Sequence, residues 1–197
     1  MSKPNLISVR GVSLEVQHIL PSPAGLPAAQ TPVCVFLHEG LGSIALWKNW
    51  PQEVCNSLGC EGWVYSRRGY GQSDSNPDVR GTGRLPADYM HREALEVLPD
   101  LLKALGVTSP LLLGHSDGGT IALIHASQHP VAGCVVMAPH VMVEDISVQA
   151  IAQARDNYDK LRPRLAAFHK DVDGAFWQWN DVWLSDAFRS FDIRPLL

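Results

Sequence analysis

The sequence has little charge and no long apolar run. Asp, Glu, Lys and Arg make up 18% of the 197 residues, whereas about a quarter is usual in globular domains. Hydrophobic residues reach 46%, so we expect one domain whose core is a largely buried sheet. The apolar runs are short and strand-like, which argues against a membrane span. The net charge of −4 comes without a basic patch, which argues against nucleic acid as a partner.

Cysteines are also few, and their spacing offers no metal site. Cys34, Cys55, Cys60 and Cys134 follow no metal-ligand pattern. Cys34 and Cys134 lie within apolar runs, and we expect both to be small buried residues. The N-terminus "MSKPNLISVRG" has no signal-peptide core. These features predict a cytoplasmic protein that needs no metal and no cofactor.

What the sequence does contain is a regular alternation of strand-like and helix-like segments. Residues 6–20 alternate apolar and polar side chains, which predicts an antiparallel hairpin, and a Pro/Gly/Ala-rich turn follows at 21–32. Between residues 32 and 139 we expect strands at 32–38, 62–68, 109–116 and 131–139, with helices at 46–59, 87–106 and 117–129. This order predicts an α/β fold with a mostly parallel, doubly wound sheet of about six strands.

The alternation stops after the last of these strands. Residues 144–191 have helical periodicity with no strand between the helices. We therefore divide the chain into a core at 1–143, a helical addition at 144–191, and a short final segment at 192–197.

A serine between glycines stands where a strand is expected to turn into a helix. In "LLLGHSDGGTIAL", residues 111–123, Gly114 and Gly118 flank Ser116 at two residues' distance. A G-x-S-x-G motif in this setting forms a strained turn that lifts the serine hydroxyl to the carboxyl end of the sheet. The helix that follows offers backbone N–H groups to an oxyanion. We interpret Ser116 as a nucleophile, although an ordinary helix N-cap serine would have the same neighbours.

Two further glycine-rich loops accompany this turn. "VFLHEGLGS", residues 35–43, follows the first parallel strand and can direct backbone N–H groups at the serine. We expect the oxyanion donors to be the N–H of Asp117 and one N–H from Gly40 or Leu41, with His38 and Glu39 supporting the loop. "SRRGYGQSD", residues 66–74, lacks the third glycine and the helix of a dinucleotide site.

Taken in order, these three stretches resemble the α/β-hydrolase superfamily. "FLHEGLGS" is similar to its oxyanion loop, except that Glu39 stands at the usual glycine position, and "GHSDGG" resembles its nucleophile elbow. The segment after "MAPHVMVED" looks like the helical cap inserted after the sixth strand. Within the superfamily the chain resembles small capped esterases and C–C bond hydrolases, which implies a serine hydrolase acting on a small carboxylic ester through an acyl-enzyme.

The resemblance also implies a histidine and an acid that come late in the chain. In that family the acid and then the histidine follow the nucleophile on later strands, and neither strand is visible before Leu197. We therefore expect a C-terminally truncated chain, in which 192–197 begins a missing core segment and the base lies beyond it. Alone, such a chain would be inactive.

Weaker candidates for base and acid lie inside the chain. His140 follows the sixth strand at the carboxyl edge, and some family members place the acid there, which suggests Glu144 or Asp145. The other histidines are not expected to act as the base. His115 should point away from the site, and His125 and His129 should lie at the surface or pack. His169, in the cap, should face solvent.

Aromatic residues in the helical segment suggest the substrate class. Trp177 and Trp183 are expected to line a pocket for an apolar or aromatic acyl group, although a helical layer also needs aromatics to dock. The alternatives are a C–C bond hydrolase, a cofactor-free relative of the same fold, or a non-catalytic remnant. The expected partner is a small molecule, with no membrane and no nucleic acid. The exposed edge of the sheet also admits a homo-oligomer.

Overall fold

A six-stranded sheet organises the molecule. A computed structural model describes residues 2–21 and 31–197. The strand order is β1-β2-β4-β3-β5-β6, with β1 and β2 antiparallel and β4, β3, β5 and β6 mutually parallel. The mostly parallel α/β sheet expected from the sequence is confirmed. The turn expected at 21–32 lies almost wholly outside the described residues.

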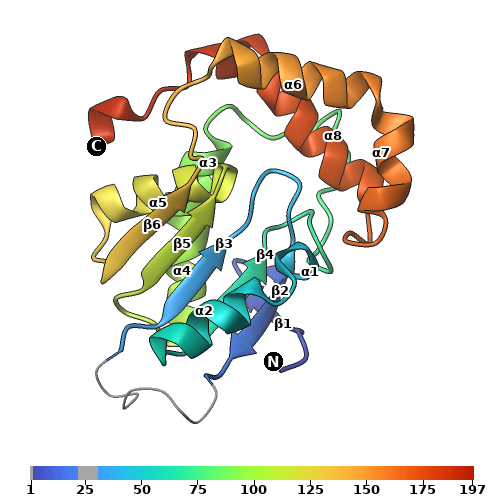
Figure 1. The fold of residues 1–197 in the computed structure, drawn as a ribbon. Coiled ribbons are helices and arrows are strands. Elements are labelled where there is room, and N and C mark those ends of the chain that lie inside the picture. The colour runs from blue at the N-terminus through green and yellow to red at the C-terminus, as the bar shows by residue number, and fades with distance from the viewer. Residues whose placement is uncertain (1, 22–30) are drawn as a thin grey trace.

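The strands alternate with helices along the chain (Figure 1). The strands are β1 (Asn5–Val9), β2 (Val12–Ile19), β3 (Cys34–Leu37), β4 (Gly62–Ser66), β5 (Leu111–His115) and β6 (Gly133–Met137). The α-helices are α1 (Ile44–Trp47), α2 (Trp50–Leu58), α3 (Tyr89–Arg92), α4 (Leu98–Leu105), α5 (Asp117–Gln128), α6 (Asp145–Asp156), α7 (Tyr158–Leu165) and α8 (Val172–Trp183). A π-helical turn, η2 (Glu93–Val97), and two 3₁₀ segments, η3 (Asp186–Ser190) and η4 (Arg194–Leu196), complete the described elements.

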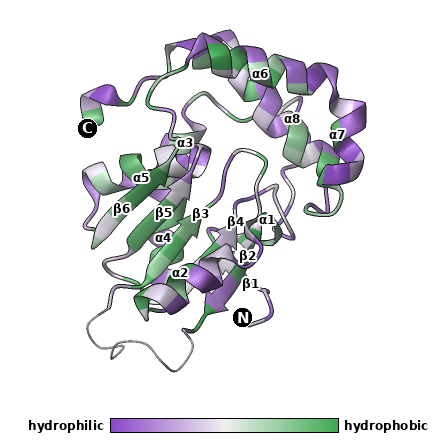
Figure 2. Cartoon of the chain, in the orientation of Figure 1, coloured by the Kyte–Doolittle hydropathy of each residue, from purple (hydrophilic) through white to green (hydrophobic). Residues whose placement is uncertain are grey.

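Both faces of the central strands are buried, because successive side chains point to opposite sides. On β3, Val35 and Leu37 join the apolar cluster under α4 and α5. Cys34 and Phe36, on the same strand, join the cluster under α1 and α2. In Figure 2, β3 and β5 are accordingly drawn mostly in green, the colour of hydrophobic residues. This double burial explains the low charge content of the sequence.

Two prolines that lie within segments expected to be helical sit in the first turn of the observed helices. Pro51 is in the first turn of α2, and Pro99 is in the first turn of α4. At Pro51 the missing N–H removes no helical hydrogen bond, whereas Pro99 follows residues that are already helical. The wider turn η2 directly precedes α4, so the segment expected as one helix at 87–106 is three consecutive helical pieces.

The last third of the described chain forms a helical layer of α6, α7 and α8. Figure 1 shows this layer over the carboxyl ends of the parallel strands. Asp171 is the N-cap residue of α8, and its carboxylate accepts the N–H of Gly174 at 2.9 Å. Helix α7 has no buried residue and is strongly hydrophilic in Figure 2. The layer therefore attaches to the core mainly through α6 and α8.

Strand β6 lies at one edge of the sheet, and its Val135 is 49% exposed. Cys134 on this strand is only half-buried, because no described strand covers that edge; the expectation of full burial was wrong. Among the described helices, none has the length and apolar character needed to cross a membrane.

Candidate active site

Ser116 occupies a sharp turn between β5 and α5. Its backbone has φ 51° and ψ −119°, a conformation that costs a residue with a Cβ about 1–3 kcal/mol. The Ser116 N–H donates to the carbonyl of Met137 at 2.9 Å, and the Ser116 carbonyl accepts the N–H of Thr120 at 3.0 Å. The turn is therefore held between the end of β6 and the first turn of α5.

The two glycines of the motif allow this turn to pack. A Cβ on Gly118 would lie 2.0 Å from the carbonyl oxygen of Leu37 at the end of β3. A Cβ on Gly114 would lie 2.3 Å from the carbonyl oxygen of Gly118. Both obstacles are backbone atoms, so a side chain could be accommodated only by moving β3 or the elbow itself.

His140 faces the serine hydroxyl. Its Nε2 lies 3.1 Å from Ser116 Oγ, and its Nδ1 lies 3.3 Å from a carboxylate oxygen of Glu144. With Nδ1–H donating to the carboxylate, Nε2 is the acceptor for the serine proton. The sequence named His140 only as a weak candidate; the structure places it within hydrogen-bond distance of the Ser116 hydroxyl.

The backbone and ring of His140 are fixed by their neighbours. The Thr120 hydroxyl accepts the His140 N–H at 2.9 Å and donates to the His140 carbonyl at 2.9 Å. The imidazole packs edge-to-face with the Trp183 ring, with 4.8 Å between centroids and an interplanar angle of 74°. Ser147 donates its hydroxyl to the Glu144 carboxylate at 3.1 Å. These contacts hold the imidazole toward Ser116.

Glu144, and not Asp145, is the acid that contacts His140. The Asp145 side chain is 90% exposed and pairs with Arg189 at 3.3 Å. The two residues are adjacent, but Glu144 precedes the first turn of α6 with extended backbone, whereas Asp145 begins the helix. The start of α6 therefore decides which carboxylate reaches the imidazole.

His38 supports the loop after β3, as its position in the sequence suggests. It is fully buried; its Nδ1–H donates to the Glu39 carbonyl at 2.7 Å and its Nε2 accepts the Arg67 N–H at 3.0 Å. Burial, together with the nearby Arg67 guanidinium, holds the pKa of His38 well below its ordinary value. The ring therefore remains neutral, in the tautomer that both hydrogen bonds require.

His169 ties the helical layer to the same loop, contrary to the expectation that it faces solvent. It is 4% exposed, accepts the Gly71 N–H at 3.1 Å and donates to the Leu41 carbonyl at 3.0 Å. Burial lowers the pKa of its ring. No local signal in the sequence distinguishes this histidine from an exposed one, because both of its partners come from distant loops.

Gly40 and Leu41 line a cavity of about 420 Å³ together with Ser116, Asp117 and His140. Ala150, Ile151, Trp179 and Trp183 of the helical layer complete its apolar wall. Trp177, expected in this wall, instead covers the Arg80 guanidinium at 4.0 Å from the ring centroid. Trp179 takes its place in the wall, and a Cβ on Gly40 would lie 2.1 Å from the Trp179 Nε1.

A buried chain of hydrogen bonds joins α8 to the elbow. The Trp183 Nε1–H donates to the Tyr89 hydroxyl at 3.0 Å, and that hydroxyl donates to the Asp117 carboxylate at 2.6 Å. Burial and the Asp117 charge raise the pKa of Tyr89 well above its ordinary range, so the hydroxyl keeps its proton. Arg67 lies 3.8 Å from the same carboxylate. Trp183 therefore contacts His140 and is also linked through Tyr89 to Asp117, the residue after Ser116.

Glu39, the departure from the usual oxyanion loop, turns its carboxylate toward His115. Glu39 Oε2 lies 3.4 Å from His115 Nδ1. Both residues line the cavity beside Ser116, so His115 does not point away from the site as expected. Within the described residues, the one group of side chains close enough to share a metal ion is Cys34, Cys55 and Cys60, at the amino end of β3 and not at this cavity.

Comparisons with known proteins agree with this architecture. "Serine hydrolase BPHL" of Homo sapiens is 46% identical over 67 residues, a match that spans 34% of this chain and only 21% of the human protein. An esterase from Exiguobacterium antarcticum has a similar structure, with a TM-score of 0.66 and 18% identity over 99% of this chain and 76% of that chain. A carboxylesterase structure from Nitrososphaera gargenis gives a TM-score of 0.64 and 17% identity over 95% of this chain and 72% of the other. A sequence model of the alpha/beta hydrolase fold matches residues 32–178. The chain therefore belongs to the alpha/beta hydrolase fold family.

Proposed function

We propose that this chain is a serine hydrolase in which Ser116 attacks the carbonyl carbon of a small carboxylic ester. The observation that carries the proposal is the 3.1 Å contact between Ser116 Oγ and His140 Nε2 at a strained strand-to-helix turn. A nucleophile, an adjacent base and a third group that orients the base form the arrangement that activates a serine.

The first half of the reaction forms an acyl-enzyme. His140 Nε2 takes the hydroxyl proton as Ser116 Oγ bonds to the carbonyl carbon, and Glu144 stabilises the imidazolium. The Asp117 N–H at the start of α5 and an N–H from Gly40 or Leu41 are the proposed oxyanion donors, because all three residues line the cavity with Ser116. The imidazolium then protonates the departing alkoxide, and the alcohol leaves.

Water completes the cycle. His140 removes a proton from a water molecule, which attacks the acyl carbon, and the proton returns to Ser116 Oγ as the carboxylic acid departs. The sequence placed the base and the acid beyond residue 197. The proposal assigns these roles to His140 and Glu144, because they are already hydrogen-bonded in the required order.

The cavity supports an apolar acyl group. Its volume of about 420 Å³ and its wall of Trp179, Trp183 and Ile151 suit a short aliphatic or aromatic acid. Among the described residues that line it, none is Lys or Arg, and one is Glu39. A carboxylate on the acyl group would therefore meet a like charge and find no cationic partner.

The test is hydrolysis of p-nitrophenyl butyrate by the purified chain, with Ser116→Ala as control. We expect turnover that Ser116→Ala abolishes and that His140→Gln lowers by about 10²–10⁴-fold. A fluorophosphonate probe should label the unchanged chain at Ser116 and should label His140→Gln much more slowly. Absence of both turnover and labelling in folded protein would refute the proposed function. If His140→Gln hydrolysed the ester as fast as the unchanged chain, only the assignment of His140 as the base would be refuted.

A further inference from the structure

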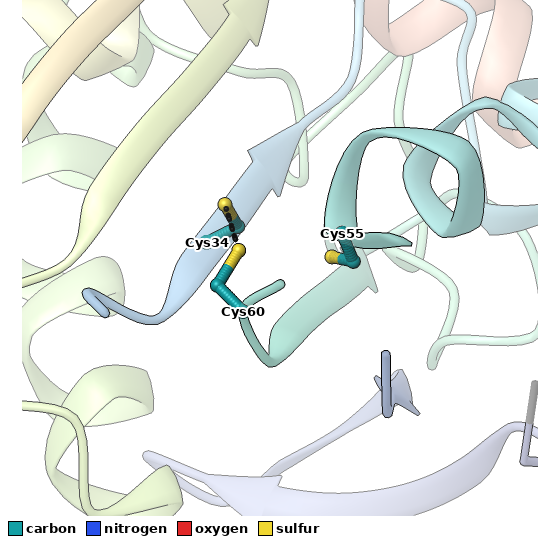
Figure 3. A group of neighbouring side chains, drawn as sticks. All are labelled: Cys34, Cys55 and Cys60. Carbon is teal, nitrogen blue, oxygen red and sulfur yellow. Dashed lines mark hydrogen bonds between the residues drawn. The ribbon is translucent and has the colours of Figure 1, made fainter. Parts of the chain in front are cut away.

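Three buried cysteines from separate elements converge on one point. Cys34 opens β3, Cys55 lies in the last turns of α2, and Cys60 follows the end of that helix. Their sulfur atoms all lie within 4.8 Å of one another. Cys34 Sγ and Cys60 Sγ are 3.3 Å apart, and the Cys55 sulfur points toward this pair (Figure 3). Each residue is at most 1% exposed.

The backbone fixes this arrangement. Gly59 ends α2 in the left-handed conformation, with φ 63°, so the chain turns back and the Cys60 N–H donates to the Cys55 carbonyl at 3.1 Å. The Cys34 N–H donates to the Glu61 carbonyl at 2.8 Å. A Cβ on Gly62 would lie 2.5 Å from Cys55 Sγ. The glycine therefore leaves the space that this sulfur occupies.

The surroundings of the three sulfurs are apolar. Ile19, Phe36, Ile44, Val64 and Leu113 belong to the same buried cluster. Burial raises the pKa of the Cys60 thiol to about 12. The hydrogen bond with Cys55, followed by burial, raises the pKa of Cys34. An uncompensated charge at this place would be costly.

Charge decides which ligand suits three such thiols. Bound as thiolates, they carry three negative charges. A monovalent metal leaves two of these uncompensated, and a divalent metal leaves one. A trivalent thiophilic centre leaves none, so its complex alone places no net charge in the apolar cluster. Soft sulfur ligands also favour a soft, thiophilic centre.

We propose that Cys34, Cys55 and Cys60 form a binding site for trivalent arsenic and similar thiophilic trivalent centres. Arsenous acid, As(OH)₃, exchanges its three hydroxyl groups for the three sulfurs. Three As–S bonds form, three As–O bonds break, and each thiol proton leaves with a hydroxyl group as water. No atom is oxidised or reduced. The site lies at the amino end of β3, apart from Ser116, and the proposal does not depend on the proposed function.

The fourth cysteine provides a matched control. Cys134 lies on β6, outside the group, and is half-buried. In the experiment, the full chain is kept reduced with a phosphine, incubated with sodium arsenite and analysed by native mass spectrometry. We expect one arsenic per chain with the loss of three hydrogen atoms. Because the sulfurs are buried, the complex forms as the turn between α2 and β4 opens, so the reaction is followed over hours.

Variants locate the bound arsenic. Cys55→Ala leaves two thiols and should weaken arsenite binding by at least about tenfold, equivalent to about 1.4 kcal/mol, whereas Cys134→Ala should bind like the unchanged chain. Cys60→Ala provides the same test if Cys55→Ala does not fold, as judged by circular dichroism. Equal binding by the variants of the group, loss of binding in Cys134→Ala, or no adduct on the folded chain would overturn the proposal. Stronger occupancy by Cd²⁺ than by arsenite would overturn the charge argument.

Discussion

Replacing Ser116 by glycine should give a more stable fold than replacing it by alanine, although both variants lose the Ser116 hydroxyl. With φ 51° and ψ −119°, Ser116 lies where a Cβ is strained, at a cost of about 1–3 kcal/mol. Both substitutions remove the same hydroxyl contact with His140, so that contribution cancels between them. Alanine keeps the Cβ and its strain, and glycine does not.

The expected difference follows from two opposing effects. Removing the Cβ recovers about 1–3 kcal/mol of strain. Glycine, however, gains conformational freedom in the unfolded chain, which costs about 0.4–1 kcal/mol. The net gain of glycine over alanine is therefore on the order of 1 kcal/mol. In a chain of this length, that corresponds to a rise in Tm of about 2–4 °C.

The assay is thermal unfolding of the two variants, followed by circular dichroism and by calorimetry at the same pH and salt. Urea unfolding should show the same order of midpoints without a change in slope. A glycine variant as stable as the alanine variant, or less stable, would refute the idea that strain is stored at this turn. Esterase activity should be absent from both variants, which separates the stability effect from catalysis.

Three further outcomes are expected. Glu144→Gln should lower kcat/KM for p-nitrophenyl butyrate by about 10–10²-fold. This loss is smaller than for a fully buried triad acid, because the Glu144 side chain is 38% exposed. Asp145 is the neighbouring residue and faces solvent, so Asp145→Asn should leave activity unchanged. Gly118→Ala should unfold the chain or markedly lower its Tm, because the new Cβ would lie 2.0 Å from a backbone oxygen of β3. Stability should fall as the pH drops below about 6.5. The folded state holds His38 and His125 at lowered pKa values, so the unfolded chain binds protons that the folded chain does not. The free energy of unfolding should decrease by up to about 1.4 kcal/mol per pH unit for each group.

A specific result would contradict each of these predictions. Equal losses in the glutamate and aspartate variants would mean that the Glu144 contact with His140 does not matter for turnover. A normal Tm for Gly118→Ala would mean that the elbow does not pack against β3 as described. A Tm that is constant between pH 7.5 and 5 would contradict the burial of neutral histidines, and His125→Gln should make the pH slope of the unchanged chain shallower.

Local sequence patterns were sufficient for the sheet and for the elbow. Continuous apolar runs bounded by glycine and proline mark β3 and β5, because a strand buried on both faces needs no polar side chains. The sharp turn at Ser116 could be predicted because its motif is local. The turn, the glycines at 114 and 118 and the following helix are adjacent in the chain, so the constraint on their spacing is written in consecutive residues.

Cys134 shows where local patterns fail even within a strand. Its apolar neighbours predicted burial, but β6 lies at the edge of the sheet among the described strands. Whether a strand is central or at an edge depends on which other strands pair with it. Strand pairing is a non-local property that the strand's own residues do not encode.

The sequence by itself determined the α/β alternation, the helices that follow β6 and the position of the serine. Only the tertiary structure decided the partners of single side chains: Glu144 rather than Asp145 at His140, Trp179 rather than Trp177 at the cavity, His169 under the loop after β3, and three cysteines at one point. The physical reason is the range of the interactions. Periodicity depends on neighbours within one helical turn or one strand, whereas each of these contacts depends on how separate elements pack.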